Sequence, residues 1–390
     1  HRDLHSFPTR RSSDLIPFFP LSGYYFFYFA AVGIILPFLG LYFQSLGLSA
    51  IEIAQLLAVL SFARIVSPPI WALLADRKGN FLFYVQLASW LSAGLVLGLW
   101  WLEGFWSLFW LMALLGFFWH AALPPMESLT LSHLGSQLSG YSRIRLWGSV
   151  GFIVAVMGAG WLIEAFGQLA FLVTTTVFFM ATALISQWNR ESPQLRPGSV
   201  DWQGLLGLLR QSMVWWVLII ALLTQIAHGI YYSFYSILLA DASYSNASIG
   251  LLWSLGVVAE IGLFWFFWRL SPLLRFYHWV LIATLLSVVR WWLTGFFVDS
   301  LVLMILAQLM HAATFAVFHS VVVQWLHETF VGHQAQGQAL YASFSYGVGG
   351  VLGSLVAGYA WTYGGGEWTF GLAAGVSLLA CALVWKVKQA

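Results

Sequence analysis

Twelve long apolar segments divide the chain, and short polar stretches separate them. The segments lie at 17–43, 52–75, 81–102, 105–132, 144–164, 168–188, 213–240, 248–269, 278–298, 301–326, 337–361 and 367–385. Each is close to the ~20 residues that a helix needs to cross the hydrocarbon core of a bilayer. Transmembrane barrel strands are about 10 residues long and alternate in polarity, so these continuous runs predict helices. We expect an all-α membrane protein with twelve transmembrane helices.

The longest polar stretch, 189–212, separates two sets of six apolar segments. Its Pro, Ser and Gly content is typical of a linker, and residues 201–210 form a short amphipathic piece. The two sets also resemble each other. Aligning Ile53 with Ile249 places Arg64 on Glu260, and at nearly the same offset LWGS at 146–149 matches LYAS at 340–343.

Such a parallel repeat predicts two pseudo-symmetric six-helix bundles. We place the N-terminal half at 16–188, a cytoplasmic linker at 189–212 and the C-terminal half at 213–390. The first fifteen residues, HRDLHSFPTRRSSDL, lack an apolar core and do not resemble a signal peptide. We therefore treat residues 1–15 as a leader that is not part of the native fold.

Composition agrees with a membrane protein. Of 390 residues, 61% are hydrophobic and only 8% are charged, with a mean hydropathy of +0.83. A water-soluble domain carries roughly 25% charged residues, so the expected surroundings are a lipid bilayer. The net charge of +2 gives no reason to expect nucleic acid as a partner. The single cysteine, Cys381, excludes an internal disulfide and a cysteine-based metal cluster.

Basic residues follow every even-numbered segment except the tenth, and the alternate loops carry only acids. The basic residues are Arg77, Lys78, Arg143, Arg145, Arg190, Arg196, Arg210, Arg269, Arg275, Lys386 and Lys388, and the acids are Glu52, Glu103, Glu164, Asp241, Asp299 and Glu367. Because Lys and Arg are enriched in cytoplasmic loops, we expect the even-numbered loops and both termini on the cytoplasmic side of a bacterial inner membrane.

Ionisable side chains inside apolar segments are costly and usually functional. In the N-terminal half, Glu127 and Arg145 are 145 − 127 = 18 residues apart across a short loop, so antiparallel helices would place them side by side. A planar guanidinium matches a carboxylate in two hydrogen bonds. The pair could bind the polar end of a substrate, or it could only clamp two helices together.

The C-terminal half holds Glu260, Arg290 and His311 within apolar segments. Burial favours the neutral form of a carboxyl group, so Glu260 is a candidate proton carrier, or else a permanent partner of Arg290 or Arg64. The near-neutral titration of histidine suits His311 to proton handling. Arg290, flanked by aromatics in SVVRWW, could be a gate, a substrate-anion site or the counter-ion of Glu260.

Further candidates lie beside these residues. His228, Tyr231 and Tyr232 could line a cavity at helical spacing. For Arg64 a structural role and a functional role are equally open, whereas His120 and His319 fit packing positions. His311 and His319 are 319 − 311 = 8 residues apart with no acid at ligand spacing, which disfavours a metal site.

The loop after the second segment reads WALLADRKGN. Asp76 and Arg77 can hydrogen-bond to neighbouring helix ends, and Gly79 permits the turn. We interpret these three residues as a conformational latch. The stretch resembles the major facilitator superfamily signature G-x-L-A-D-R-x-G-R-K, with Ala72 in place of the first Gly and with Asn80 and Phe81 in place of the basic pair.

Within that superfamily the chain resembles the lactose-permease-like proton symporters, and most of all the phenylpropionate transporters of enteric bacteria. The motifs YSRIRLWGSVGF, HGIYYSFYSILL, LLWSLGVVAEI and LMHAATFAVFH carry the resemblance. It implies that Glu127 and Arg145 contact the solute, and that Glu260, Arg290 and His311 stand where the permease has its second-half charges. It also implies proton symport.

Two departures from the permease bear on that mechanism. The permease has a Lys where this chain has Gln308 and a proton-carrying Glu where this chain has Thr314. The proton relay therefore cannot be transferred whole. Glu260 or Glu127, with His311, would have to carry the proton, and a galactoside becomes a weaker candidate substrate.

We expect a monomeric transporter, not an enzyme, with no cofactor beyond the coupling proton. The substrate would be a small organic solute such as an aromatic carboxylate, held by Arg145 or Arg290. One alternative is a proton-coupled carrier of sugars or nucleosides. A polytopic acyl or glycosyl transferase is disfavoured, because the sequence has no nucleophile or metal-binding cluster near a membrane face. A non-transporting receptor stays open.

Overall fold

The computed structural model describes residues 16–135, 139–191 and 202–389, and within them the chain is helical without strands. The predicted leader at 1–15 and residues 192–201 of the predicted linker lie outside these residues. The N-terminal half contains α1 Phe18–Ser45, α2 Ala50–Lys78, α3 Phe81–Val96, η2 Leu97–Trp100, α4 Phe105–Leu134, α5 Ser139–Phe166 and α6 Gln168–Ser186.

A short helix within the predicted linker region, α7 Trp202–Leu209, precedes the C-terminal half. That half contains α8 Ser212–Asp241, α9 Asn246–Leu270, η3 Ser271–Leu273, α10 Phe276–Phe296, α11 Leu301–Leu309, η4 Ala312–Val317, α12 Phe318–Thr329, α13 Gln334–Tyr341, η5 Ala342–Gly349 and α14 Gly350–Gln389. Both η4 and η5 are π-helical. π-Helical stretches are rare in proteins, and those that occur are often found at functional sites.

The chain turns back at Gly365 within α14. Gly365 has φ 65° and ψ −159°, a conformation that glycine adopts without a Cβ penalty. Before the turn, Gly358 lies against Ala54 of α2, and after it Phe370 lies against Gly295 of α10. The 55-residue apolar stretch Gln334–Lys388 would be about 80 Å long as one helix. It therefore crosses a ~30 Å bilayer core twice.

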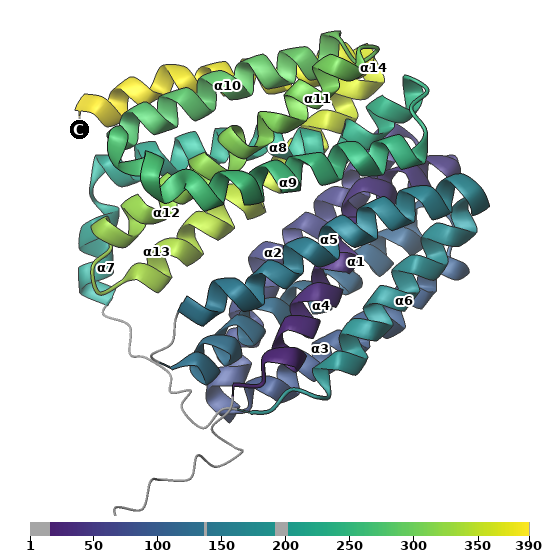
Figure 1. Cartoon of the computed structure of the whole chain (residues 1–390), viewed down its shortest axis with the longest axis horizontal. Helices are drawn as coiled ribbons and strands as arrows, with labels where there is room; N and C mark the ends of the chain where they lie inside the picture. The colour runs from purple at the N-terminus through teal and green to yellow at the C-terminus, as the bar shows by residue number, and fades with distance from the viewer. Residues whose placement is uncertain (1–15, 136–138, 192–201, 390) are drawn as a thin grey trace, which may run out of the picture.

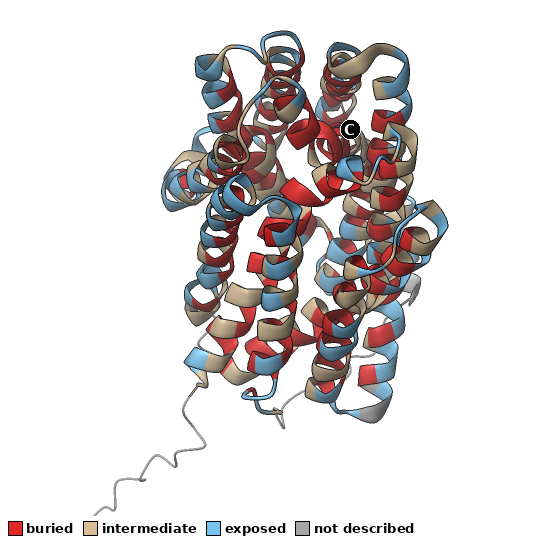
Figure 2. Ribbon diagram, turned by 90° about the vertical axis from the view of Figure 1, so that its right-hand side faces the viewer, coloured by how far each residue is buried: buried red, intermediate tan, exposed pale blue. Residues whose placement is uncertain are grey.

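The described residues contain eleven candidate membrane spans. Because the stretch Gln334–Lys388 crosses the bilayer twice, the eleven spans correspond to twelve crossings. The predicted all-α membrane fold with twelve crossings is thus confirmed. Large apolar side chains are exposed on the outer surface, among them Trp265 at 77% and Trp106 at 68%. In Figure 2 the buried residues lie along the inner sides of the helices and the exposed ones along the outer sides. This distribution suits a surface that faces lipid.

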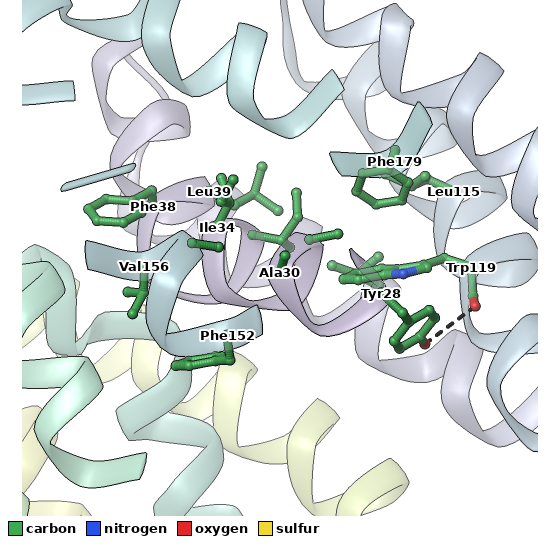
Figure 3. Close-up of a cluster of buried hydrophobic side chains, with 14 of the residues drawn as sticks. Tyr28, Ala30, Ile34, Phe38, Leu39, Leu115, Trp119, Phe152, Val156 and Phe179 are labelled. Atoms are coloured by element: carbon green, nitrogen blue, oxygen red, sulfur yellow. Dashed lines mark hydrogen bonds between the residues drawn. The ribbon is translucent and has the colours of Figure 1, made fainter. Parts of the chain in front are cut away.

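The helices form two bundles, one from α1 to α6 and one from α8 to α14 (Figure 1). Within the first bundle, α1 packs on α5 and α6, and its tyrosines hydrogen-bond to α4. Figure 3 shows part of this core, where the hydroxyl of Tyr28 donates to the carbonyl of Trp119 at 3.5 Å. Phe152 and Val156 reach the same core from α5.

The two bundles touch through small residues of α5 and α9. A Cβ added at Gly160 would lie 2.6 Å from the carbonyl oxygen of Asn246, so the backbones are already in contact there. Glu164 Oε2 accepts a hydrogen bond from the backbone N–H of Asn246 at 2.7 Å. Figure 1 shows the bundles meeting at this end and diverging toward the end that carries α7 and α13. By the distribution of basic residues, the joined end is the one predicted to lie outside the cytoplasm.

Small residues also set the packing inside the C-terminal half. A methyl group at Gly353 of α14 would lie 2.8 Å from the Cα of Gly229 of α8. Gly353→Ala should therefore force α14 and α8 apart and lower the free energy of unfolding by about 1–3 kcal/mol. The measurement is the midpoint of thermal unfolding in detergent. Gly375→Ala in α14 meets nothing within 4 Å and is the matched control. Equal effects of the two substitutions would contradict the close packing.

Candidate functional site

The C-terminal half brings its predicted titratable residues into direct contact. His311 Nε2 lies 2.7 Å from Glu260 Oε1, and the two side chains are only 8% and 16% exposed. Glu260 comes from the middle of α9, and His311 stands where α11 gives way to the π-helical η4. A carboxyl and an imidazole at this distance share a hydrogen bond, and a proton can reside on either of them.

Arg290 of α10 lies beside this pair and is completely buried. Its Nη1 donates to Thr314 Oγ1 at 3.1 Å, whereas its Nε and second Nη find no hydrogen-bond partner. The guanidinium carbon lies 4.5 Å from the ring centre of Tyr231 and 4.2 Å from that of Trp291. Aromatic faces attract a desolvated cation through the ring quadrupole. Two aromatic rings and one hydroxyl therefore surround the charge.

Side chains of α8 complete the cluster. Nδ1 of His228 donates to the carbonyl of Thr224 at 2.8 Å, and the ring centre of His228 lies 5.9 Å from that of His311. The hydroxyl of Tyr231 donates to Gln308 Oε1 at 3.0 Å. Gln308 and Thr314, the two departures from the permease pattern, are thus the neutral partners of Tyr231 and Arg290.

In the N-terminal half, Glu127 and Arg145 do not form a direct ion pair. Tyr141 donates to Glu127 Oε1 at 3.5 Å. The guanidinium of Arg145 instead lies over the ring of Phe29, 3.9 Å from its centre. A Cβ at Gly148 would lie 2.7 Å from an Nη of Arg145, so Gly148 makes room for this stacked position. The 18-residue spacing brought both charges to one region without fixing their geometry.

A cavity of about 60 Å³ lies between the two halves. It is lined by α1, α2 and α4 on one side and by α8, η5 and α14 on the other. The residues that line it are Val32, Ile35, Leu36, Leu57, Leu60, Ser61, Arg64, Trp119, Gln225, Gly229, Tyr232, Ser233, Tyr346, Gly350 and Ser354. Of the predicted substrate residues, only Tyr232 is among them.

Arg64 is the charged residue among those that line this cavity, and it is solvent-accessible. Its Nε donates to Nε2 of His120 at 3.3 Å. His120 in turn stacks on Trp119, with ring centres 5.1 Å apart. Spacing alone left the role of Arg64 open. The internal repeat, which aligns Arg64 with Glu260, was the signal that could have singled it out.

The predicted latch is described in part. Gly79 ends α2 with φ 66°, and its N–H donates to the carbonyl of Ala75 at 2.8 Å. Arg77 is exposed, and the side chain of Asp76 lies outside what the structure describes. The glycine therefore makes the turn for which it was predicted, and the latch itself stays a prediction.

His319, expected to be a packing residue, is hydrogen-bonded to the hydroxyls of Tyr341 and Tyr346 at 3.3 and 2.9 Å.

Two six-helix bundles around a cavity, with ionisable side chains on the surrounding helices, define a secondary transporter of the major facilitator type. The family model described as "MFS_1 like family" matches residues 18–372, and the chain belongs to this family. It is therefore a membrane transporter and not an enzyme.

The chain is 30% identical to the probable 3-phenylpropionic acid transporter of Escherichia coli (strain K12) over 352 residues, which cover 87% of this chain and 90% of that protein. It is 29% identical to the maltose permease of Geobacillus stearothermophilus over 281 residues, covering 70% and 69%. Among solved structures, the nucleoside transporter NupG superposes with a TM-score of 0.82 at 17% identity, covering 96% of this chain and 99% of that chain.

The buried charge of Arg290 generates a prediction. Thr314→Val keeps the size of the side chain but removes the hydroxyl that accepts from Arg290 Nη1. Loss of a hydrogen bond to a charged group should lower the free energy of unfolding by about 1.5–3 kcal/mol, measured as the unfolding midpoint in detergent. Thr284→Val is the control, because that buried hydroxyl bonds only to carbonyls of its own helix. Equal losses in both variants would contradict a special role for Thr314.

Proposed function

We propose that the chain is a proton-coupled symporter that takes up a small aromatic carboxylate by alternating access of one central cavity. The two bundles would rock about that cavity and open it to either side in turn. The name of the Escherichia coli relative supports an aromatic acid as the substrate. The cavity supports it as well, because Trp119, Tyr232 and Tyr346 offer aromatic faces and the leucines of α1 and α2 offer apolar walls.

The observation that carries the proton part is the contact of His311 with Glu260 at 2.7 Å. It lies one layer behind the cavity, since Tyr232 lines the cavity and its ring centre is 6.0 Å from that of His228. His228 in turn packs on His311. A titratable pair in this position can take up a proton in one facing state and release it in the other.

Charge balance sets the expected stoichiometry. A proton bound at the Glu260–His311 pair adds one positive charge, and a bound carboxylate adds one negative charge. The loaded carrier then has the same net charge as the empty one, which keeps the cost of burying charge in the membrane low for both. We therefore propose one proton for each carboxylate.

Reconstituted protein tests this proposal. In proteoliposomes, an inward proton gradient should drive accumulation of labelled 3-phenylpropionate, and a protonophore should abolish it. A potassium–valinomycin potential alone should drive little uptake, because one-to-one symport is electroneutral. Protein-free liposomes measure passive entry of the neutral acid and must be subtracted. Protein-dependent uptake that ignores the protonophore would exclude proton coupling.

A substitution assigns the proton to its residue. Glu260→Gln should lose accumulation against a gradient by at least about 10-fold, while exchange of substrate across the membrane continues. Neutral glutamine keeps a polar group at His311 but binds no proton. Glu103→Gln, in an exposed loop, is the matched control and should transport as the wild type does. Loss of both activities, or of neither, would count against Glu260 as the coupling residue.

A carrier of sugars or nucleosides is the second candidate. Gln225, Ser61, Ser233 and Ser354 line the cavity and could bind hydroxyl groups, and the maltose permease is a relative. Competition separates the two candidates. Inhibition of uptake by maltose, galactosides or uridine, with no effect of excess 3-phenylpropionate, would favour the second.

A further inference from the structure

Arg64 occupies an unusual position for a cation within a membrane span. It lies near the middle of the span Ala50–Ala75 and lines the cavity between the two halves. In the part of the chain that the structure describes, no carboxylate comes within ion-pair distance of it. Its one hydrogen bond, from Nε to Nε2 of His120 at 3.3 Å, goes to an uncharged acceptor. An uncompensated charge at this depth is expensive.

The geometry leaves Arg64 ready to bind an anion. A guanidinium has five N–H donors, and His120 engages one of them. Because His120 is itself buried and stacked on Trp119, it holds the Nε edge of the guanidinium in place. The remaining donors belong to a side chain that solvent can reach from the cavity. Two of them in parallel match the two oxygens of a carboxylate.

The other two candidate arginines are less suited. Arg290 is completely buried behind Tyr231 and Trp291 and does not line the cavity. The guanidinium of Arg145 covers the ring of Phe29, near the end of α5 that follows the predicted cytoplasmic loop. Of the three, only Arg64 faces space that both halves of the transporter enclose.

We infer that Arg64 is the carboxylate-binding residue of the central cavity, and that His120 is its positioning residue. This inference rests on the proposed uptake of an aromatic acid. The aromatic ring of the substrate would lie among Trp119, Tyr232 and Tyr346, which line the same cavity. Ring stacking of this kind adds to the apolar burial of the ligand.

The cavity is also connected to the proton pair along a second set of contacts. The hydroxyl of Tyr346 is hydrogen-bonded to His319 at 2.9 Å. His319 stacks on Phe315, and Phe315 stacks on His311, with ring centres 6.3 and 5.2 Å apart. An anion bound at Arg64 would therefore share the cavity with Tyr232 and Tyr346, from which these two sets of contacts lead to the His311–Glu260 pair.

Binding to purified protein, measured by calorimetry, tests the assignment. The probes are 3-phenylpropionate and its uncharged amide, 3-phenylpropanamide. Wild-type protein should bind the acid roughly 10- to 100-fold more tightly than the amide. This ratio of affinities corresponds to the contribution of one hydrogen-bonded contact between charged groups. Arg64→Gln should bind both equally, near the wild-type affinity for the amide, and Arg64→Lys should keep part of the preference. Arg275→Gln, in an exposed loop, is the control and should behave as the wild type.

The outcomes separate the two proposals. If wild-type protein prefers the acid and Arg64→Gln keeps the full preference, the Arg64 assignment is overturned while the proposed function stands. If wild-type protein binds neither probe, both are overturned.

A second measurement does not depend on a folded variant. Phenylglyoxal modifies accessible arginines, and 3-phenylpropionate should protect the peptide with Arg64 but not the one with Arg275. Unprotected Arg64 at saturating acid would overturn the assignment.

Discussion

A charge inside a lipid bilayer must be compensated, and this requirement organises the interior of the protein. Three ionisable groups inside membrane spans meet this requirement differently. Glu260 meets an imidazole, Arg290 meets aromatic faces and a hydroxyl, and Arg64 meets one imidazole and the central cavity. Side chains of the protein alone surround the first two. The third is complete only when something enters the cavity, which is why an unpaired cation there points to a ligand.

The internal repeat gives this arrangement a simple form. Arg64 and Glu260 occupy equivalent positions in the second helix of each half, and they carry opposite charges. In the proposed mechanism, the substrate anion binds to the N-terminal bundle and the coupling proton to the C-terminal bundle, with the cavity between them. Small residues such as Gly160 at the contact between bundles leave the backbones free of interlocking side chains. Such surfaces suit a rocking movement of one half against the other.

The resemblance to the lactose permease implies that neutral residues stand here in place of two charged groups. Gln308 accepts from Tyr231, and Thr314 accepts from Arg290. These replacements remove one positive and one negative charge together, so the net charge of the cluster is preserved. In the proposed mechanism, the proton-binding role falls to Glu260, whose carboxyl contacts His311.

The sequence by itself determined that the protein is surrounded by lipid, how many times it crosses the membrane, and that it consists of two halves. Lipid imposes these features through segment length and apolar composition, which are local and can be counted. It also indicated which charged residues matter. Tertiary structure decided how they meet. The 18-residue spacing of Glu127 and Arg145 predicted a pair, yet Arg145 stacks on Phe29 from another helix. Arg290 was expected at the substrate and is enclosed, while Arg64 reaches the cavity. The rotation of each helix and the π-helical stretch after His311 set these positions, and both depend on packing between segments far apart in the chain.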